Sequence, residues 1–167
     1  MNKKKISGLR RLFKDEKVVI KETDGKTKMA EKLEVHYSSL GTESKSLGLE
    51  NPQEPSKETA VELYEMTQDA DFKSMFGQFC KDAGKPDEVC FTQNQIVEFC
   101  QNHKNYLHTY RATFFLFKED NNHFVVDVRL GIISFLASLH AFQDSFDWDA
   151  SYLHCLAVPV NTSRVST

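Results

Sequence analysis

The hydrophobic and polar positions divide the chain into a polar N-terminal part and a C-terminal part with periodic apolar runs. Apolar residues are scattered up to residue 57 and recur in short patterned groups from residue 58 onward. This predicts an α+β fold: a small antiparallel sheet of about four to six strands packed against two short helices, with a basic N-terminal arm. The expected regions are 1–57 (basic arm, possible hairpin and polar linker), 58–160 (α+β globular domain) and 161–167 (frayed tail).

Two stretches have the apolar periodicity of helices. The first places apolar side chains at positions 72, 75, 76, 79 and 80, with Asp69 as the expected N-cap. The second begins at Thr92, whose hydroxyl is expected to cap the amide of Gln95 while the Gln95 side chain returns to the Thr92 amide. Phe91 and Ile96 are spaced as a hydrophobic staple at the same helix start.

Several stretches favour strands. Residues 111–118 and 123–130 flank a polar turn; the first is apolar on both faces, whereas Asp127 and Arg129 predict one wet face for the second. The stretch 59–66 fits a strand or a helical turn, and 132–142 fits either a helix or a strand. A final strand is expected over 152–158, closed by Pro159.

The N-terminal third has weaker signals. Residues 17–23 predict a strand, and Asp24-Gly25 predicts a hairpin whose return strand falls within 28–37, although 29–33 fits a helix equally. The Ser-, Gly-, Glu- and Pro-rich stretch 38–57 is typical of a linker or long loop.

The charge is unevenly distributed. Residues 1–28 hold ten Lys or Arg against four Asp or Glu, a net charge of +6, and the remainder holds eleven against twenty, a net charge of -9. Such an arm can bind a nucleic acid or an acidic protein surface, or it can fold back on its own body. The candidate binding residues are Lys3, Lys4, Lys5, Arg10, Arg11 and Lys14 in the arm and Tyr106, Tyr110 and Arg111 in the body.

Cysteine and histidine offer one possible polar site, formed by Cys100, His103 and His154. A catalytic thiolate needs a neighbouring base, but Cys100 occupies a position of the apolar stripe, which favours simple packing. No Cys-x₂-Cys pair is present, so we expect no metal site, and no motif calls for a cofactor. The absence of a signal-peptide pattern and of a long apolar run predicts a cytoplasmic protein with free thiols and no transmembrane segment.

Parts of the chain resemble a family of short bacterial proteins without an assigned activity. The similarity lies in the Thr-Gln-x-Gln-Ile pattern from Thr92, a Phe-Cys-x-x-His run, the strand 113–118 and a Trp-x-Ala…His…Pro stretch over 148–159. The resemblance implies a helix pair packed on an antiparallel sheet and favours a strand over 135–142. It implies no chemistry.

Because no catalytic motif is present, the sequence favours a non-enzymatic binding or accessory module over an enzyme. Its partner is not specified by the sequence. The alternatives are a nucleic-acid- or ribosome-associated factor that uses the basic arm, and a Cys–His enzyme.

Overall fold

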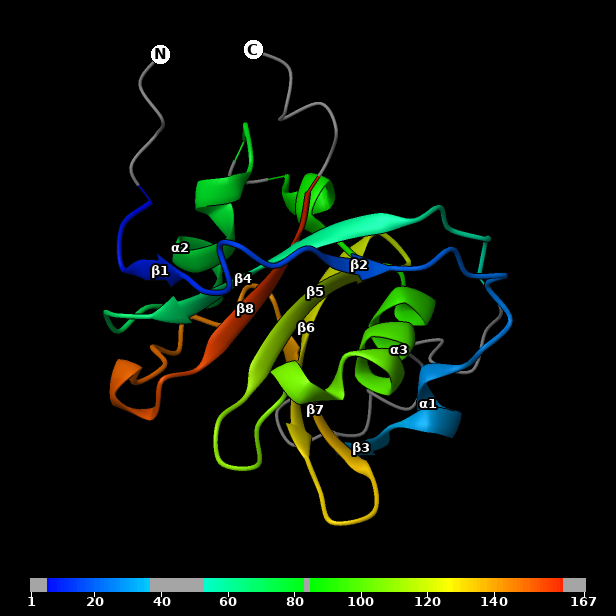
Figure 1. The fold of residues 1–167 in the computed structure, drawn as a ribbon. Coiled ribbons are helices and arrows are strands. Elements are labelled where there is room, and N and C mark those ends of the chain that lie inside the picture. The colour runs from blue at the N-terminus through cyan, green and yellow to red at the C-terminus, as the bar shows by residue number, and fades with distance from the viewer. Residues whose placement is uncertain (1–5, 37–52, 83–84, 161–167) are drawn as a thin grey trace.

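The computed structural model describes residues 6–36, 53–82 and 85–160, whose strands join in one mixed sheet (Figure 1). The strands are β1 (Leu9–Arg11), β2 (Val18–Ile20), β3 (Glu34–His36), β4 (Thr59–Met66), β5 (Thr113–Glu119), β6 (Asn122–Leu130), β7 (Phe135–Ala141) and β8 (Cys155–Val160). The α-helices are α1 (Met29–Lys32), α2 (Phe72–Phe76) and α3 (Gln93–Asn102); short 3₁₀ turns are η2 (Gly77–Phe79), η3 (Pro86–Val89), η4 (Lys104–Tyr106) and η5 (Ala150–Tyr152). The combination of helices with a sheet is confirmed, but the described part of the chain has eight strands rather than four to six and three α-helices rather than two, and its sheet is mixed rather than antiparallel.

The strand order is β1-β4-β8-β5-β6-β7-β3, and β2 pairs with the other end of β4. Most neighbours are antiparallel, but β3 with β7 and β5 with β8 are parallel. The sheet is strongly twisted, since β4 runs across the view of Figure 1 whereas β6 and β7 run from top to bottom.

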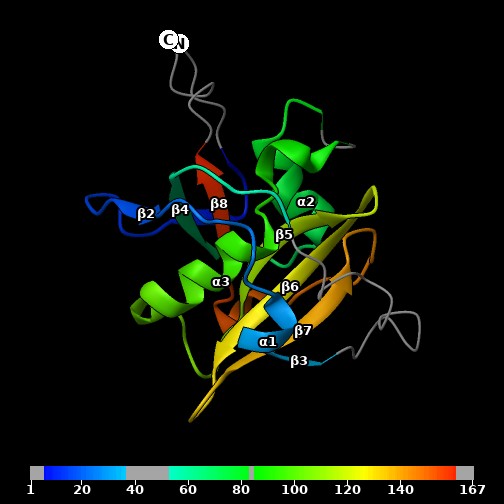
Figure 2. The ribbon, with the colours of Figure 1, turned by 90° about the vertical axis from the view of Figure 1, so that its right-hand side faces the viewer.

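Both faces of the sheet are covered (Figure 2). On one face, called the α3 face, α3 and α1 pack on β5, β6 and β7. On the other, called the α2 face, α2 and the turns after it pack on β4, β5 and β8. The sequence predicts that the strand over 111–118 is apolar on both faces. This is confirmed in β5, where Phe114, Phe115, Leu116 and Phe117 are all fully buried.

The start of α3 is as predicted. Thr92 Oγ1 accepts from the Gln95 amide at 3.1 Å, and Gln95 Oε1 accepts from the Thr92 amide at 2.9 Å, which completes the capping box. Phe91 and Ile96 are both buried in the α3-face core. The helix ends at Asn102, and η4 follows.

The cap of α2 differs from the prediction. Asp71, not Asp69, is its N-cap, with Oδ1 accepting from the Ser74 amide at 2.7 Å. Asp69 Oδ1 instead accepts from the Ala150 amide at 2.8 Å. Asp69 thus joins two distant segments rather than starting a helix.

The β5–β6 hairpin is confirmed, and its turn residues Asp120 and Asn121 have φ of 47° and 65°, the left-handed values of a type I′ turn. The wet face expected for β6 is wrong. Asp127 is buried on the α2 face, where its Oδ2 lies 2.6 Å from His140 Nε2. The charged residue of the alternating pattern of β6, Asp127, thus contacts a histidine inside the fold rather than water.

The N-terminal hairpin is also wrong: of Asp24 and Gly25, only Gly25 has a positive φ, so the pair forms a bend and not a type I′ turn. Gly25 has φ of 77°, and a Cβ there would lie 2.0 Å from the carbonyl oxygen of Gln53, so only glycine fits. The chain then forms α1, which was the alternative reading of 29–33, and β3 pairs with β7 while β2 pairs with β4. The three strands before position 58, β1, β2 and β3, therefore belong to the same sheet. This part of the chain also supplies Val18 and Met29 to the hydrophobic core.

The ambiguous C-terminal segments are strands. The stretch 59–66 is β4, and within 132–142 the strand is β7, the form that the family resemblance favours. The last strand, β8, lies between β4 and β5 and continues through Pro159 to Val160. Pro159 is tolerated because it lies beyond Cys155 and Leu156, the two residues through which β8 pairs with β5.

Candidate functional site

A cavity of about 310 Å³ opens on the α2 face beside the segment that connects β7 to β8. Four aromatic side chains contribute to it, and its polar lining is limited to two aspartates, one arginine and one histidine. We call it the Trp148 pocket; it is lined by Tyr110, Arg129, Phe146, Asp147, Trp148, Asp149, Tyr152 and His154. An apolar cavity with a few convergent polar groups is the usual form of a small-ligand site.

Trp148 is held in place by the backbone. Its amide donates to the Ala70 carbonyl at 2.9 Å, and the Ala70 amide donates back to the Trp148 carbonyl at 3.3 Å. The indole packs against Phe114 and Phe72, with ring centroids 4.7 Å and 5.5 Å away. The connecting segment is therefore fixed to the β4–α2 loop, and the wall of the pocket is preformed.

Buried polar groups lie beneath Trp148. The Asp127–His140 pair is on one side, and the His140 ring meets the indole edge-to-face with centroids 5.3 Å apart. His154 meets the same indole edge-to-face, also at 5.3 Å, and stacks on Tyr152. Strands β6 and β7 and the residue directly before β8 each place a polar side chain here, although a core made only for packing needs none.

The tautomer of His154 follows from its hydrogen bond. Nδ1 accepts from the Ala112 amide at 3.0 Å, so the neutral ring carries its proton on Nε2. Burial lowers the pKa of His154, and the nearby Arg129 charge lowers it further, against weaker opposing effects of Asp127 and Asp149. The ring is thus held neutral and offers an N–H donor at Nε2.

Arg129 is the unusual group of the pocket. It takes part in none of the ion pairs formed among the described residues. Its Nε is buried and has no hydrogen-bond partner in that same part of the chain. A partly buried guanidinium in this condition has unused donors, which is costly unless a ligand or water accepts from them.

The turn before β8 carries backbone strain. Leu153 has φ of 56° and ψ of 39°, a left-handed conformation that leucine rarely adopts. It follows η5, which Asp149 caps by accepting from the Ser151 amide at 2.8 Å. The left-handed residue lies between Tyr152 and His154, whose rings stack with centroids 5.8 Å apart.

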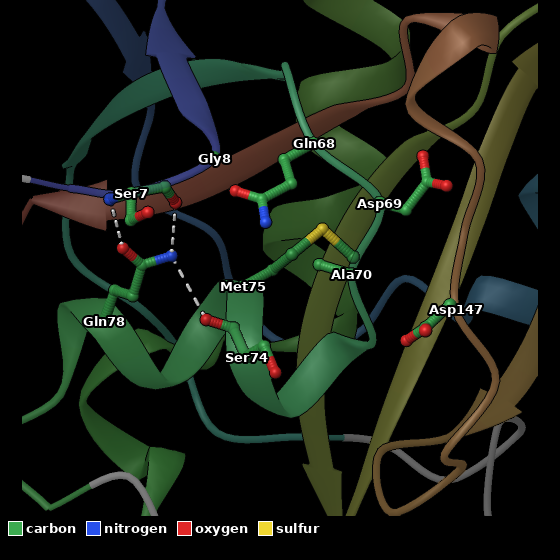
Figure 3. Close-up of a pocket in the computed structure, with 9 residues that line it drawn as sticks. All are labelled: Ser7, Gly8, Gln68, Asp69, Ala70, Ser74, Met75, Gln78 and Asp147. Carbon is green, nitrogen blue, oxygen red and sulfur yellow. Dashed lines mark hydrogen bonds between the residues drawn. The ribbon is translucent and has the colours of Figure 1, made fainter.

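A second cavity of about 400 Å³ adjoins the first and shares Asp147 with it (Figure 3). The Gln78 amide lies between Ser7 and Ser74: it accepts from the Ser7 amide at 2.6 Å and donates to both backbone carbonyls. These polar groups satisfy one another and join β1 to α2. Among the described residues that line this cavity, none has a buried side-chain nitrogen or oxygen without a hydrogen-bond partner, which distinguishes it from the Trp148 pocket.

The basic residues expected to bind a partner are placed as follows. Lys3, Lys4 and Lys5 lie outside the described residues. Arg10 and Arg111 both pair with the buried carboxylate of Glu65, Arg111 at 3.0 Å, and Arg11 pairs with Glu62 at 2.9 Å. Lys14 is exposed in the turn after β1. The described arginines of the arm thus face their own sheet.

The three body residues expected beside the arm are not gathered into one patch. The Tyr106 hydroxyl donates to Glu16, and its ring packs on Phe13 with centroids 4.9 Å apart. Arg111 is bound by Glu65, as described, and also contacts His108. Tyr110, 90% exposed, is the one of the three that lines the Trp148 pocket.

The possible Cys–His site is divided between the two faces. Cys100 is fully buried on the α3 face, and burial raises the pKa of its thiol, which disfavours a nucleophilic thiolate. His103 Nε2 lies 2.8 Å from the Val19 carbonyl oxygen. His154 lies on the α2 face against Phe114, so the sheet separates it from Cys100.

Away from the pocket, three side chains of metal-ligand type converge. Asp87, Cys90 and His123 place one potential ligand atom each within 4.8 Å of the others, and no other such group occurs among the described residues. Sequence spacing did not predict this cluster, although Asp87-x₂-Cys90 has the short spacing of a ligand pair.

Comparison with known proteins gives no match: no family model fits the chain, and no curated protein and no solved structure is significantly similar to it. The resemblance to a bacterial family thus stays a prediction. In the part of the chain that the structure describes, no helix has the length and apolar character needed to cross a membrane.

The sequence contained only a partial signal for the pocket. The acidic and aromatic stretch 144–149 marks the connecting segment, and Trp148 is the single tryptophan of the chain. Nothing in the sequence indicates that Arg129 lines the pocket or that His140 lies beneath Trp148. An alternating pattern does not show that the polar side chains of β6 meet those of β7 beneath Trp148.

Proposed function

We propose that this protein is a binding module, and that its ligand is a small organic anion with a planar apolar body held in the Trp148 pocket. The observation that carries the proposal is Arg129, a partly buried guanidinium that lacks an ion-pair partner among the described residues. Its planar fork suits a carboxylate or phosphate group, to which it can donate two parallel hydrogen bonds.

The rest of the lining fits the rest of such a ligand. The rings of Trp148, Tyr152 and Phe146 offer faces and edges for a planar body. His154, neutral with its proton on Nε2, adds a second donor without adding a charge. A volume of about 310 Å³ is at the small end of ligand cavities, which favours a compact compound over a polymer.

The two aspartates of the pocket favour a different ligand, an organic cation. Asp147 and Asp149 with four aromatic rings resemble the surroundings that attract an organic cation. However, Asp149 is exposed and already accepts from the Ser151 amide, whereas Arg129 Nε is buried without a hydrogen-bond partner among the described residues. Because the unsatisfied group, Arg129, is positively charged and partly buried, it favours an anionic ligand over a cationic one.

The test uses Trp148 itself, because the single tryptophan makes intrinsic fluorescence a direct report on this pocket. The full chain is titrated with benzoate, benzyl alcohol and benzylamine, which share a ring and differ in charge. We expect a saturable change with benzoate, and binding weaker by about 10-fold or more for the other two, since a hydrogen bond to a charged group contributes roughly 1.5–3 kcal/mol.

Two variants locate the effect. Arg129→Met keeps the aliphatic stem and removes the charge, so benzoate affinity should fall by about 10-fold or more. Arg11→Met is the matched control, because Arg11 lies on β1 and pairs with Glu62 outside the pocket. Tighter binding of benzylamine than of benzoate would overturn the anion assignment, and no saturable change with any probe would overturn the pocket as the binding site.

A further inference from the structure

The cluster of Asp87, Cys90 and His123 lies where η3 meets the β5–β6 hairpin. Asp87 is within η3, Cys90 directly follows that turn, and His123 is at the start of β6. His123 Nε2 is 2.7 Å from Asp87 Oδ1, and the Cys90 sulfur completes a group whose ligand atoms all lie within 4.8 Å. One oxygen, one nitrogen and one sulfur thus face a common point.

We propose that Asp87, Cys90 and His123 bind a Zn²⁺ ion. A mixed sulfur, nitrogen and oxygen set suits this borderline-soft ion, whereas Mg²⁺ and Ca²⁺ prefer oxygen alone. Three ligands at zinc bond lengths of roughly 2.0–2.3 Å lie about 3.5 Å from one another. On binding, Asp87 Oδ1 and His123 Nε2, now 2.7 Å apart, would separate slightly, and the Cys90 sulfur, within 4.8 Å of both, can take its place beside them. The Asp87 side chain is 56% exposed and can make that adjustment freely.

The proposed site has a defined consequence for the fold. Binding joins η3, which packs on the α2 face, to the first residues of β6. The Cys90 thiol releases its proton to solvent as the Zn–S bond forms, and a water molecule takes the fourth tetrahedral position. Lys118, whose Nζ is 3.3 Å from Asp87 Oδ1, exchanges this contact for the oxygen that does not bind the ion.

The competing interpretation is that these groups only bind one another. Without an ion, Asp87 accepts from His123 and pairs with Lys118, and the Cys90 thiol donates weakly to the Pro86 carbonyl at 3.5 Å. Both arrangements satisfy the side chains, so measurement has to separate them. A thiolate bound to metal has an absorption that a hydrogen-bonded cluster cannot produce.

The experiment is a titration of the full, reduced chain with Co²⁺, followed by absorption spectroscopy and then by displacement with Zn²⁺. We expect a thiolate-to-cobalt charge-transfer band that saturates at one ion per chain and disappears as Zn²⁺ is added. Cys90→Ser should abolish the band, and Asp87→Asn and His123→Gln should each weaken binding by more than about 100-fold, because loss of an outer-shell partner alone costs roughly 10- to 100-fold.

Controls keep the outcome interpretable. Cys155→Ser removes a thiol that donates to the Leu153 carbonyl at 3.6 Å, and His36→Gln removes an exposed histidine on β3; both variants should bind Co²⁺ as the unchanged chain does. Asp87→Asn alters an exposed side chain and should fold normally even if Cys90→Ser does not. Absence of the band, or a band that survives in Cys90→Ser or Asp87→Asn, would overturn the site.

Discussion

The regions beneath α3 and beneath Trp148 are built on opposite faces of the same strands, but they differ in what they bury. Beneath α3, Phe99 and Cys100 meet Phe115 in a fully buried apolar core. Beneath Trp148, aromatic rings surround the Asp127–His140 pair, and His154 lies on the other side of the indole. Both regions contain cysteine or histidine among aromatic residues, but among the described residues only the region beneath Trp148 encloses an Asp–His pair, formed by Asp127 and His140.

This difference explains why the Cys–His pattern in the sequence is a poor guide to a site. Cys100 behaves as a small hydrophobic side chain of a helix that covers the sheet. The candidate site instead forms where β6, the residues before β5 and the segment between β7 and β8 bring an arginine, a histidine and four rings together. The predictions below separate a region that only stabilises from one that also binds.

The largest expected effect comes from truncating one phenylalanine on each face. Phe99→Ala and Phe114→Ala should each lower the free energy of unfolding by about 3–5 kcal/mol, because both rings are fully buried. Only Phe114→Ala should also change the Trp148 fluorescence of the folded protein and weaken benzoate binding, since Phe114 contacts the indole. Urea unfolding and the fluorescence titration measure the two effects separately.

Phe99→Ala serves as the control for Phe114→Ala, because it removes the same side chain from the other face. Equal loss of benzoate affinity in the two folded variants would mean that the faces do not differ in function. In that case both faces would contribute to stability through packing, and neither would be distinguished by binding.

A smaller effect should follow from acidification. The pKa of His154 is lowered, first by burial and then by Arg129, so the unfolded chain binds the proton more readily than the folded one. Stability from this group is complete above the unfolded pKa of about 6.5 and is lost as pH falls toward the folded pKa, with a slope below about 1.4 kcal/mol per pH unit for one proton.

His154→Asn isolates that contribution, because the amide oxygen can still accept from the Ala112 amide while the titrating ring is gone. The pKa of His108 is also lowered, by burial and by Arg111, so the unchanged chain should lose stability from both histidines. Urea unfolding at several pH values should therefore show a shallower loss in His154→Asn than in the unchanged chain. Identical slopes of stability against pH in the two proteins would show that His154 does not contribute to the pH dependence.

The parts of the fold that the sequence predicted are those that neighbouring residues determine. The capping box of Thr92 and Gln95 and the turn at Asp120 and Asn121 each depend on contacts within a few residues. The positive φ of Gly25 agrees with its place in the predicted turn, but the hairpin did not form, because one left-handed glycine fixes local dihedral angles and not the partner of the strand before it. That partner is β4, some forty residues later along the chain.

The parts that were not predicted depend on contacts between distant segments. The number of strands was too low because the short β1 and β3 gain their stability only from pairing with β4 and β7. Alternation assigned Asp127 to water because a pattern cannot distinguish solvent from a buried histidine. The Trp148 pocket belongs to the same class, since Arg129 and His154 meet only in the folded sheet.

The smallest effect should come from the strained turn beside the pocket. Leu153 is left-handed, which costs roughly 1–2 kcal/mol for a residue with a Cβ, whereas glycine loses roughly 0.5–1 kcal/mol in backbone entropy. Leu153→Gly should therefore raise the free energy of unfolding by about 0.5–1 kcal/mol. Ser151→Gly, two residues earlier in η5, lacks this compensation and should lower it by up to about 1 kcal/mol.

The same pair of variants tests whether the strain serves the pocket. Leu153 fixes the chain between Tyr152 and His154, so a glycine there should loosen their stacking and weaken benzoate binding by a few fold even as the fold becomes more stable. A gain in stability with unchanged affinity would make the strain incidental. Opposite changes in stability and binding would extend the contrast between the two faces to the backbone itself, because His103, the C-cap of α3, has a φ of -128°.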